Sequence, residues 1–443
     1  MKYLLSVLLC FSPCLLFSQG KTWSLEDCMR YAVENSTTRA KQEAQNEIYR
    51  QSHREAIGNM LPSLNAGTGA STSFGRGLDP ETNTYTNVNS FNNSYEIYSS
   101  VVLFDGLYRA SLVKLYKLNR LKGEHQLQYV EDMLAYETMA MFFNVLYYKG
   151  AVALAQQQLE ESSANLKQVE RMEELGLKSA PDVAEMLAKE AEDRYTLTKQ
   201  VNLYNLELIR LKEKMNYPIE EELQVSDVQI VEPAGKKQED VAGIFNGNMG
   251  YSPKILSAAK ELEASRMELK GVKGRVYPTI SLNGGFNTGF SRLMNNSDYI
   301  PFGEQLSNKR GYYVSASLSI PIFNGFSRSA NIGRSKQNVI IAENNYNETL
   351  RTVYSEIDRA VSDLNGLADE YGQSAKKTQA MEMAHQVNQR KYSEGLISAI
   401  ELSTSSNRLL QSRVEKLYTG LKYQLQDRLV NYYKGRRLIS TEN

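Results

Sequence analysis

Apolar and polar residues alternate one by one along residues 311–322. Val314, Ala316 and Leu318 fall on one side of an extended chain, and Tyr313 and Ser315 fall on the other. A period of two predicts a β-strand with one apolar face and one polar face. The same alternation occurs at residues 62–72, 95–104 and 277–290. The pattern therefore predicts four strands of about ten residues, which is long enough to cross a bilayer when the strands are tilted.

The four strands form two pairs, and a long polar connection joins the strands of each pair. These connections, residues 74–94 and 291–310, are rich in Asn. The polar side of the strands carries small and hydroxyl-bearing residues, which do not fill the closed core of a soluble protein. On the alternation alone two interpretations stay open: two amphipathic hairpins on a soluble protein, or strands that face lipid on one side.

Two stretches without proline, residues 106–176 and 325–395, predict very long helices. Each stretch begins and ends at a glycine, and each is followed by a return helix. The first long hairpin therefore covers residues 106–216, and the second covers residues 324–434. The two glycine turns that form their tips are expected near residues 176 and 395.

Shorter helices are expected before each strand pair, at residues 21–60 and 251–275. A return helix and a strand-leading helix together match one long helix in length. We therefore expect each long helix to pack beside two shorter helices that lie end to end. Residues 217–250, rich in Glu, Gln and Lys with several glycines, predict an irregular equatorial insert, and residues 435–443 form a C-terminal tail. Ser24 with Asp27 predicts a capping box at the first helix start.

The two halves of the chain repeat the same motifs 216 to 219 residues apart. The repeated motifs are Leu61-Pro62-Ser63-Leu64 with Tyr277-Pro278-Thr279-Ile280-Ser281-Leu282, Phe104-Asp105-Gly106 with Phe323-Asn324-Gly325, and Leu175-Gly176-Leu177 with Glu394-Gly395-Leu396. A unit that cannot bury its own apolar face is commonly duplicated so that the copies pack together. Both halves thus predict the same order of helix, strand pair, very long helix, glycine turn and return helix.

The first twenty residues have the features of a cleaved signal peptide. Lys2 precedes an apolar run, and the small residues Ser18 and Gly20 follow it. Removal of residues 1–20 leaves Cys28 as the single cysteine, so neither an internal disulfide nor a site with several thiols is expected. No later apolar stretch approaches the ~20 residues that a membrane-spanning helix needs. Any crossing of a membrane is therefore expected to use the strands.

Charge and motif content argue against nucleic-acid binding and catalysis. Lys and Arg total 51 and Asp and Glu total 51, so the net charge is zero and no nucleic-acid partner is indicated. The three histidines, His53, His125 and His385, lack the spacing of a metal site. No nucleophile elbow, phosphate-binding loop or dinucleotide fingerprint is present. We expect no enzyme activity, no cofactor and no metal site.

Four strands are too few to close a barrel. The smallest bacterial barrels have about eight strands, and an open edge in lipid would leave backbone groups without hydrogen bonds. If the strands lie in a membrane, several chains must therefore share one barrel.

Taken in order, these motifs resemble the outer membrane efflux proteins, which are TolC-like. The resemblance covers the mature chain from Trp23-Ser24-Leu25-Glu26 through the strand motifs to both glycine turns. It implies a mainly α fold with a transmembrane β-barrel: a homotrimer with a 12-stranded barrel, four strands per chain, continuous with an α-helical tunnel in the periplasm. It also implies outer-membrane lipid, a periplasmic adaptor (membrane fusion) protein and an inner-membrane transporter as partners, in a Gram-negative bacterium.

The resemblance directs attention to the two glycine turns as the narrow periplasmic end of such a channel. An adaptor is expected to contact the tips at Gly176, Leu177, Ser179, Gly395, Leu396 and Ser398. The simpler interpretation is that the glycines and serines only cap helices. That interpretation leaves a leucine at each tip unexplained.

The aperture itself is assigned to Asp182, Glu401, Thr404 and Ile397. In a trimer, Asp182 and Glu401 would each recur three times around one axis, and an acidic ring favours cations. Taken alone, a carboxylate at this place more often serves the helix dipole. Members of the family commonly carry a second carboxylate where this chain has Thr404 and an arginine where it has Ile397. Apolar contacts are therefore expected to contribute more to closure here.

The function predicted from these features is a passive outer-membrane exit duct of a tripartite efflux or type I secretion system. Its selectivity would rest on bore, charge and closure. The competing interpretation is a soluble periplasmic coiled-coil scaffold or adaptor without channel activity. The sequence does not distinguish export of drugs, metals or proteins.

Overall fold

The computed structural model describes residues 22–78, 83–87, 89–233, 235, 239–294 and 299–439. The predicted signal peptide lies outside these residues. The chain forms two compact units. The helical unit comprises Met1–Arg39, Val130–Asn248 and Tyr354–Asn443, and the sheet unit comprises Ala40–Tyr129 and Met249–Val353.

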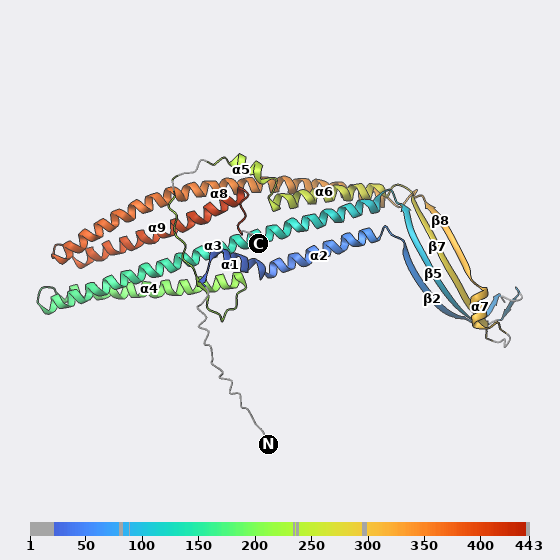
Figure 1. Cartoon of the computed structure of the whole chain (residues 1–443), viewed down its shortest axis with the longest axis horizontal. Helices are drawn as coiled ribbons and strands as arrows, with labels where there is room; N and C mark the ends of the chain where they lie inside the picture. The colour runs from blue at the N-terminus through green and yellow to red at the C-terminus, as the bar shows by residue number, and fades with distance from the viewer. Residues whose placement is uncertain are drawn as a thin grey trace, which may run out of the picture. The chain divides into compact units, whose positions relative to one another are not determined.

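A four-stranded antiparallel sheet dominates the sheet unit (Figure 1). Its strands are β2 (Ser63–Ser73), β5 (Ser90–Phe104), β7 (Thr279–Leu293) and β8 (Gly311–Ser319), hydrogen-bonded in that order. Strands therefore form in all four alternating segments. β5 begins five residues before the predicted start at residue 95, and β8 ends at Ser319, three residues before the predicted end at residue 322. β2 and β8 are the edge strands of this sheet.

The register of the strands separates the sheet into an apolar face and a polar face. Directly opposed residues of antiparallel strands point to the same face. One row across the sheet consists of Ala66, Ile97, Phe286 and Tyr312. A row on the opposite face consists of Ser63, Ser100, Asn283 and Ser315. The predicted alternation is thus present in the folded sheet.

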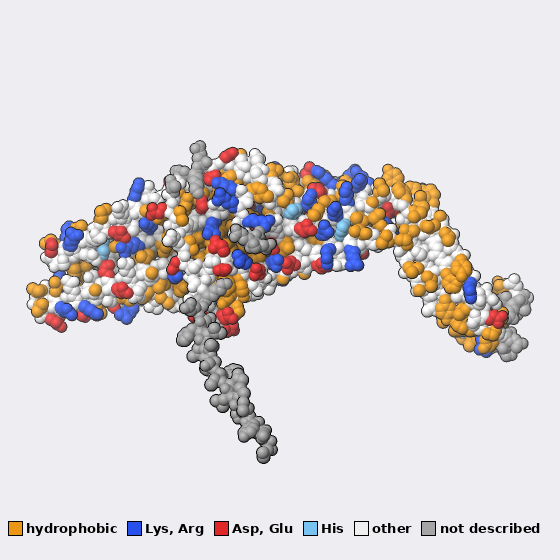
Figure 2. All heavy atoms as spheres, in the orientation of Figure 1, with side chains coloured by type: hydrophobic (Ala, Val, Ile, Leu, Met, Phe, Trp, Pro, Cys, Tyr) orange, Lys and Arg blue, Asp and Glu red, His pale blue; other side chains and the backbone are white. Residues whose placement is uncertain are grey.

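Side chains of the apolar face are largely uncovered. Leu64 is 75% exposed, Val314 is 81% exposed and Leu318 is 61% exposed. Hydrophobic side chains gather over the sheet in the space-filling view (Figure 2). On the polar face Ser100 Oγ donates a 2.7 Å hydrogen bond to Asn283 Oδ1. The described residues of the chain therefore leave both faces of the sheet largely uncovered.

The connections between paired strands contain more structure than the sequence indicated. The first includes a short hairpin of β3 (Arg76–Leu78) and β4 (Tyr85–Asn87), and the second includes helix α7 (Phe302–Asn308). β7 runs six residues past Asn287, where its pairing with β8 ends. The buried side chain of Gln305 in α7 bonds both the N–H and the C=O of Ser291 there, at 3.1 and 3.0 Å. α7 thus satisfies an edge that β8 leaves open.

Helices α2 (Thr37–Gly58) and α6 (Pro253–Gly274) lead into the strands. The strands lead out into α3 (Tyr108–Glu174) and α8 (Ser327–Ser393), each of 67 residues. Within the sheet unit α3 lies against α2 and α6, and Lys122 Nζ is 2.6 Å from Glu261 Oε2. None of the helices in the described ranges has a stretch long and apolar enough to cross a membrane.

The helical unit contains the remainder of α3 and α8 with the return helices α4 (Ala180–Met215) and α9 (Ala399–Tyr433). Its main core is formed by fully buried side chains of α1, α3 and α4, including Met29, Phe142, Leu211 and Met215. Cys28 is buried in the same core. Each long helix thus packs beside its return helix in this unit.

Two expectations about the shorter segments need correction. The single helix predicted over residues 21–60 is two helices, α1 (Leu25–Glu34) and α2, because Ser36 caps a new helix start through the backbone N–H groups of Thr38 and Arg39. The insert at residues 217–250 is not irregular throughout. It holds β6 (Gln224–Val225), which pairs in parallel with β1 (Thr22–Trp23), and helix α5 (Val241–Asn248). The capping box of Ser24 and Asp27 is confirmed.

Asp132 in α3 gives the helical unit a predicted pH dependence. Burial raises the pKa of its carboxyl to about 6, although a 2.9 Å hydrogen bond from the Tyr432 hydroxyl opposes the shift. The raised pKa means that Asp132 stabilises the fold below pH ~4 and loses this contribution as pH rises through ~6. We expect Asp132→Asn to raise the free energy of unfolding at pH 7.5 by about 1–3 kcal/mol, because the buried charge is removed.

Thermal unfolding of wild type and Asp132→Asn in detergent, at pH 4.5 and 7.5, checks this prediction. The difference between the two proteins should shrink at the lower pH, where wild-type Asp132 is protonated. A constant difference at both pH values would show that Asp132 does not titrate in this range.

Candidate functional site: the two hairpin tips

Both hairpin tips are built by the same backbone geometry. Gly176 and Gly395 have φ values of +74° and +77°, which glycine adopts without steric cost. The N–H of Leu177 bonds the carbonyl of Met172 at 2.8 Å, and Gly176 bonds Glu173 at 2.8 Å. This pair of hydrogen bonds is a Schellman motif, and Gly395 and Leu396 form the same motif in the second half. The duplicated glycines therefore end α3 and α8 in the same way.

The return helices begin with matching capping boxes. Ser179 N and Oγ both donate to Asp182 Oδ2, at 3.0 and 2.7 Å. In the second half Glu401 N donates to Ser398 Oγ at 3.2 Å, and Ser398 N donates to Glu401 Oε2 at 3.3 Å. The hydrogen bonds from Ser179 lower the pKa of Asp182, which favours its charged form. Capping is therefore one role of both carboxylates.

The tip leucines are exposed although each lies in a well-formed turn. Leu177 is 68% exposed and Leu396 is 67% exposed. Ser179, Ser398, Glu401 and Thr404 are also exposed, and the Thr404 hydroxyl donates back to the Ile400 carbonyl of its own helix. Their contacts within the chain are local, so their functional assignments stay predictions.

A small apolar cluster holds the two tips together. It contains buried Val169, Met186, Tyr392, Ala399 and Leu402, with Leu166, Val183 and Ile397 packed against it. The Nζ of Lys178 lies 4.8 Å from the centre of the Tyr392 ring. Burial and the charges of Asp182 and Glu185 raise the pKa of Tyr392, which places Asp182 near the second hairpin.

Ile397 therefore differs from the other residues assigned to the aperture, because its side chain packs against this cluster. Tyr392, Val169 and Met186 were not singled out from the sequence. Their signal is weak, because each lies before or after a tip in a long helix whose apolar positions look alike. Only contacts between residues more than 200 positions apart identify them.

Above the tips, hydrogen bonds between polar side chains, most of them buried, join the two hairpins. Gln158 of α3 donates to Ser406 of α9, and the Nζ of Lys189 in α4 bonds Asn407 Oδ1 at 2.6 Å. Lys189 is also paired with Asp193, and these two residues are 6% and 3% exposed. Buried ion pairs add little net stability, but their geometric demands favour one register over others. This layer therefore fixes how the hairpins align.

A histidine adds a further link between the hairpins. His385 of α8 is buried, and its Nε2 lies 2.6 Å from Glu161 Oε1 of α3. Its Nδ1 lies 3.3 Å from the Ser405 hydroxyl. Burial favours a raised pKa at Glu161, but hydrogen bonds from His385 and Gln389 outweigh it, so the pKa is lowered. His385 thus has a packing role, as a lone helical histidine usually does.

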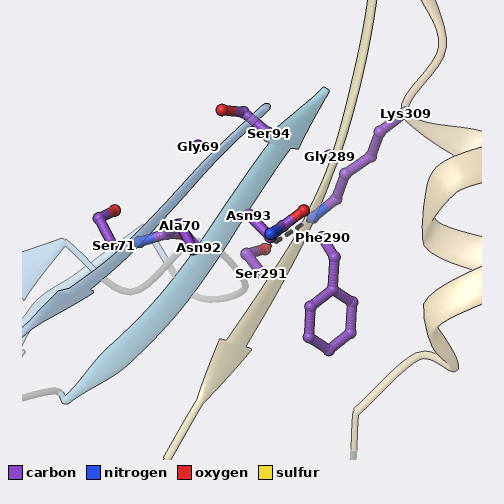
Figure 3. Close-up of a pocket in the computed structure, with 10 residues that line it drawn as sticks. All are labelled: Gly69, Ala70, Ser71, Asn92, Asn93, Ser94, Gly289, Phe290, Ser291 and Lys309. Carbon is purple, nitrogen blue, oxygen red and sulfur yellow. Dashed lines mark hydrogen bonds between the residues drawn. The ribbon is translucent and has the colours of Figure 1, made fainter. Parts of the chain in front are cut away.

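A second feature lies on the polar face of the sheet, near the ends of the strands that carry the long connections. A hollow of about 330 Å³ is lined by small and polar residues, including Gly69, Ser94 and Gly289. Figure 3 shows Lys309 reaching toward Ser291, whose hydroxyl accepts a 2.6 Å hydrogen bond from the lysine Nζ. The small lining residues leave this hollow open, and their polar groups do not form a cluster of ligands around one point. No group of three or more His, Cys, Asp or Glu side chains suited to a metal ion occurs in the described ranges.

The family model described as "Outer membrane efflux protein" matches residues 250–434. Residues 250–434 are therefore similar to the outer membrane efflux protein family. This family consists of transport conduits and not of enzymes. The matched segment of this chain includes α6, both strands of the second pair, α8, the second tip and α9. The internal repeat relates this segment to the first half of the chain.

Solved structures of channels share the fold over nearly the whole chain. A structure of CusC, described in terms of transmembrane channel formation, matches with a TM-score of 0.79 and 17% identity, covering 93% of this chain and 91% of CusC. The outer membrane protein VceC from Vibrio cholerae matches with a TM-score of 0.78 and 13% identity, and the match covers 94% of this chain and 96% of VceC. The CmeC outer membrane channel of Campylobacter jejuni matches with a TM-score of 0.78 and 15% identity, and the match covers 95% of this chain and 87% of CmeC. No curated protein sequence matches the chain.

Proposed function

We propose that this chain is the outer-membrane exit duct of a tripartite efflux or type I secretion system. The observation that carries the proposal is the four-stranded sheet with one exposed apolar face, one polar face and two unpaired edges. Contiguous exposed apolar surface of this kind is rare on soluble proteins and marks a surface that something covers. Lipid is the covering that fits strands of this length and alternation.

The unpaired edges support a shared barrel. Among the described residues, β2 and β8 each present one side without a partner strand, and free backbone groups cannot remain unpaired in lipid. Pairing β8 of one chain with β2 of the next satisfies both edges. Three chains then close a barrel of 12 strands, as the family resemblance implies. The apolar face meets lipid, and the Ser- and Asn-rich polar face lines the water-filled lumen.

The helical unit forms the periplasmic part of the proposed duct. The tips, with exposed Leu177 and Leu396, are its adaptor-contact surface, and the adaptor links the duct to an inner-membrane pump. The duct lowers the barrier to crossing by replacing lipid with water, and the pump supplies the energy. Closure at the tips rests on apolar packing such as that of Ile397, together with the capping carboxylates Asp182 and Glu401.

Membrane fractionation separates this proposal from a soluble periplasmic scaffold. The duct should remain with outer membranes after a high-salt wash and should be released only by detergent. The purified protein should conduct ions in planar bilayers, at least when the tips are opened by substitution. Recovery of the folded protein in the salt wash, without conductance under any of these conditions, would establish the scaffold instead.

The acidic ring at the tips makes a separate prediction for Glu401. We expect Glu401→Lys to weaken block of the channel by divalent cations roughly tenfold, because three carboxylates around one axis attract cations. Single-channel recordings with added Mg²⁺ measure the block. Glu401→Gln is the matched control for the helix start, because its amide oxygen still accepts from Ser398 N–H.

A weaker block in both variants assigns the effect to charge. An effect of Glu401→Lys alone would show that the loss of the cap, and not the loss of an acidic ring, altered the tip. Unchanged block in both would remove Glu401 from the aperture.

A further inference from the structure

A second cavity in the sheet unit lies where the strands give way to the long helices. Its volume is about 460 Å³. Thr279 and Ser319, which line it, are directly paired across β7 and β8. Both belong to the polar face, since Ser281 and Ser317 are the next pair on that face. The cavity therefore lies on the side of the sheet that faces the lumen in the proposed duct.

Three arginines line this cavity against one carboxylate. The arginines are Arg109, Arg275 and Arg328, and the carboxylate is Asp105. Asp105 lies 3.5 Å from Arg109 Nε and accepts hydrogen bonds from the Arg109 backbone N–H at 3.2 and 3.4 Å. Arg109 also donates to the carbonyl of Asn59. Arg109 is thus neutralised within the chain.

The internal repeat shows that Arg328 lacks such a partner. Arg328 stands 219 residues after Arg109, and Asn324 stands 219 residues after Asp105. The neutral amide of Asn324 retains the cap, since the Arg328 backbone N–H lies 3.5 Å from its Oδ1. The Arg328 guanidinium donates to the Pro321 carbonyl at 3.0 Å. In the described part of the chain it forms no ion pair.

Arg275 is the third cation. Its guanidinium lies 4.8 Å from the centre of the Tyr108 ring, which orients the group without cancelling its charge. It also forms no ion pair with any described residue. The N-terminus of α8 begins at Ser327 on the same cavity, and its backbone dipole adds positive potential. The cavity thus combines two uncompensated guanidinium groups with neutral donors from Thr279, Ser319 and Ser327.

We propose that this cavity binds the oxyanion group, phosphate or carboxylate, of an anionic solute in the duct. Guanidinium groups match the geometry of such groups and donate two parallel hydrogen bonds to them. The assignment of the cavity to the lumen rests on the proposed function. Three copies in a trimer would form a positively charged ring at the inner end of the barrel. Anionic solutes would be concentrated at this ring during passage.

Calorimetric titration of the detergent-solubilised protein with inorganic pyrophosphate tests the site directly. Asn324→Asp gives the second half the carboxylate that the first half has, and we expect it to weaken pyrophosphate binding about tenfold by pairing with Arg328. Arg328→Gln should weaken binding by a similar factor. Asp105→Asn should strengthen binding, because it frees Arg109 while keeping the cap.

Asn92→Asp is the matched control. It adds the same charge to the same polar face at the other end of β5, where Asn92 pairs with Ser71 and Ser291. Its affinity for pyrophosphate should equal that of wild type. The proposal is overturned if wild type does not bind pyrophosphate, if Asn324→Asp binds like wild type, or if Asn92→Asp is weakened equally.

A lipid headgroup carries the same phosphate chemistry, so the titration is repeated in nanodiscs with and without phosphatidylglycerol. Equal pyrophosphate affinity in both assigns the site to a solute in the lumen. Weaker affinity in the anionic nanodiscs would overturn that assignment in favour of lipid. The binding measurement does not need conduction. If the protein binds pyrophosphate but does not conduct ions, the proposed duct function is contradicted and the oxyanion-binding site remains. If it conducts ions but does not bind pyrophosphate, only the oxyanion-binding site is contradicted.

Discussion

Replacing both exposed tip leucines, Leu177→Arg with Leu396→Arg, is expected to abolish export while the trimer stays intact. Both side chains are about two-thirds exposed in the chain, at 68% and 67%, so their loss removes little packing. If an adaptor covers the tip, burial of each leucine would contribute about 2 kcal/mol to the free energy of adaptor binding. Loss of two leucines and burial of two unpaired charges should reduce adaptor affinity by about a thousandfold or more, on the order of 4 kcal/mol per protomer.

Complementation of a deletion strain measures this effect, by growth on a panel of toxic organic compounds and metal salts and by secretion of proteins into the medium. Migration of the unheated protein on a denaturing gel reports the trimer. Leu175→Glu is the matched control at the same tip. Leu175 is 73% exposed, and its counterpart in the second half is already the charged Glu394.

The control should support export at the wild-type level. Normal export by the double arginine variant would remove both leucines from the adaptor surface. Loss of the trimer would show that the leucines act in assembly instead.

Local patterns predicted the strands and the tips well, because local chemistry determines them. The period-two alternation forms the two faces of β8 over residues 311–319, and the last three residues of the predicted strand, 320–322, lie outside it. The end residues of the long helices follow from Gly176 and Gly395, since a left-handed residue stops a helix within one turn. The capping box predicted from the spacing of Ser24 and Asp27 forms, and Ser179 and Ser398 form boxes of the same spacing that were not predicted.

Contacts between distant segments could not be predicted in this way. The cluster around Tyr392 and the bond between His385 and Glu161 join residues on different hairpins. Gln305 completes the free edge of β7 from a connection that composition alone marked as a polar loop. In each case the residue type fits several environments, and the tertiary partner selects one of them.

Equivalent positions of the two repeats differ in residue type and in their contacts. Lys178 and Ile397 occupy equivalent positions after the two glycine turns, yet Lys178 lies over the Tyr392 ring and Ile397 packs into the cluster below it. Asp105 and Asn324 are likewise equivalent, and only the first neutralises its arginine. Comparing the halves position by position is therefore more informative than the resemblance between them.

Glycines at the strand ends provide the second prediction. Gly106 and Gly274 are buried against each other, and a Cβ on either would collide with the backbone carbonyl of the other. Gly106 also has φ +71°, which side chains disfavour. We expect Gly106→Ala to destabilise the protomer by ~3 kcal/mol or more, because neither backbone can move away. Loss of folded protein in limited proteolysis measures the effect.

The counterparts of this pair, Gly325 and Gly58, lie in open space in the single chain, since a Cβ on either would meet no atom within 4 Å. In the proposed barrel, β8 of one chain meets β2 of the next as β5 meets β7 within the chain. Gly325 should then face Gly58 of the neighbouring subunit at equally close range. Gly325 itself has φ +62°, so an alanine there would also strain the turn. Gly58 has no positive φ, and Gly58→Ala should therefore give a protomer with normal helix content that fails to form trimers.

Gly333→Ala is the matched control, since Gly333 lies within α8 with open space around it and an ordinary helical φ. It should assemble like wild type, with slightly greater stability from the better helix propensity of alanine. If Gly58→Ala assembles as readily as this control, the chains do not close the barrel with the packing that relates the two halves of one chain. Selective loss of the trimer would instead extend the internal repeat across the subunit boundary.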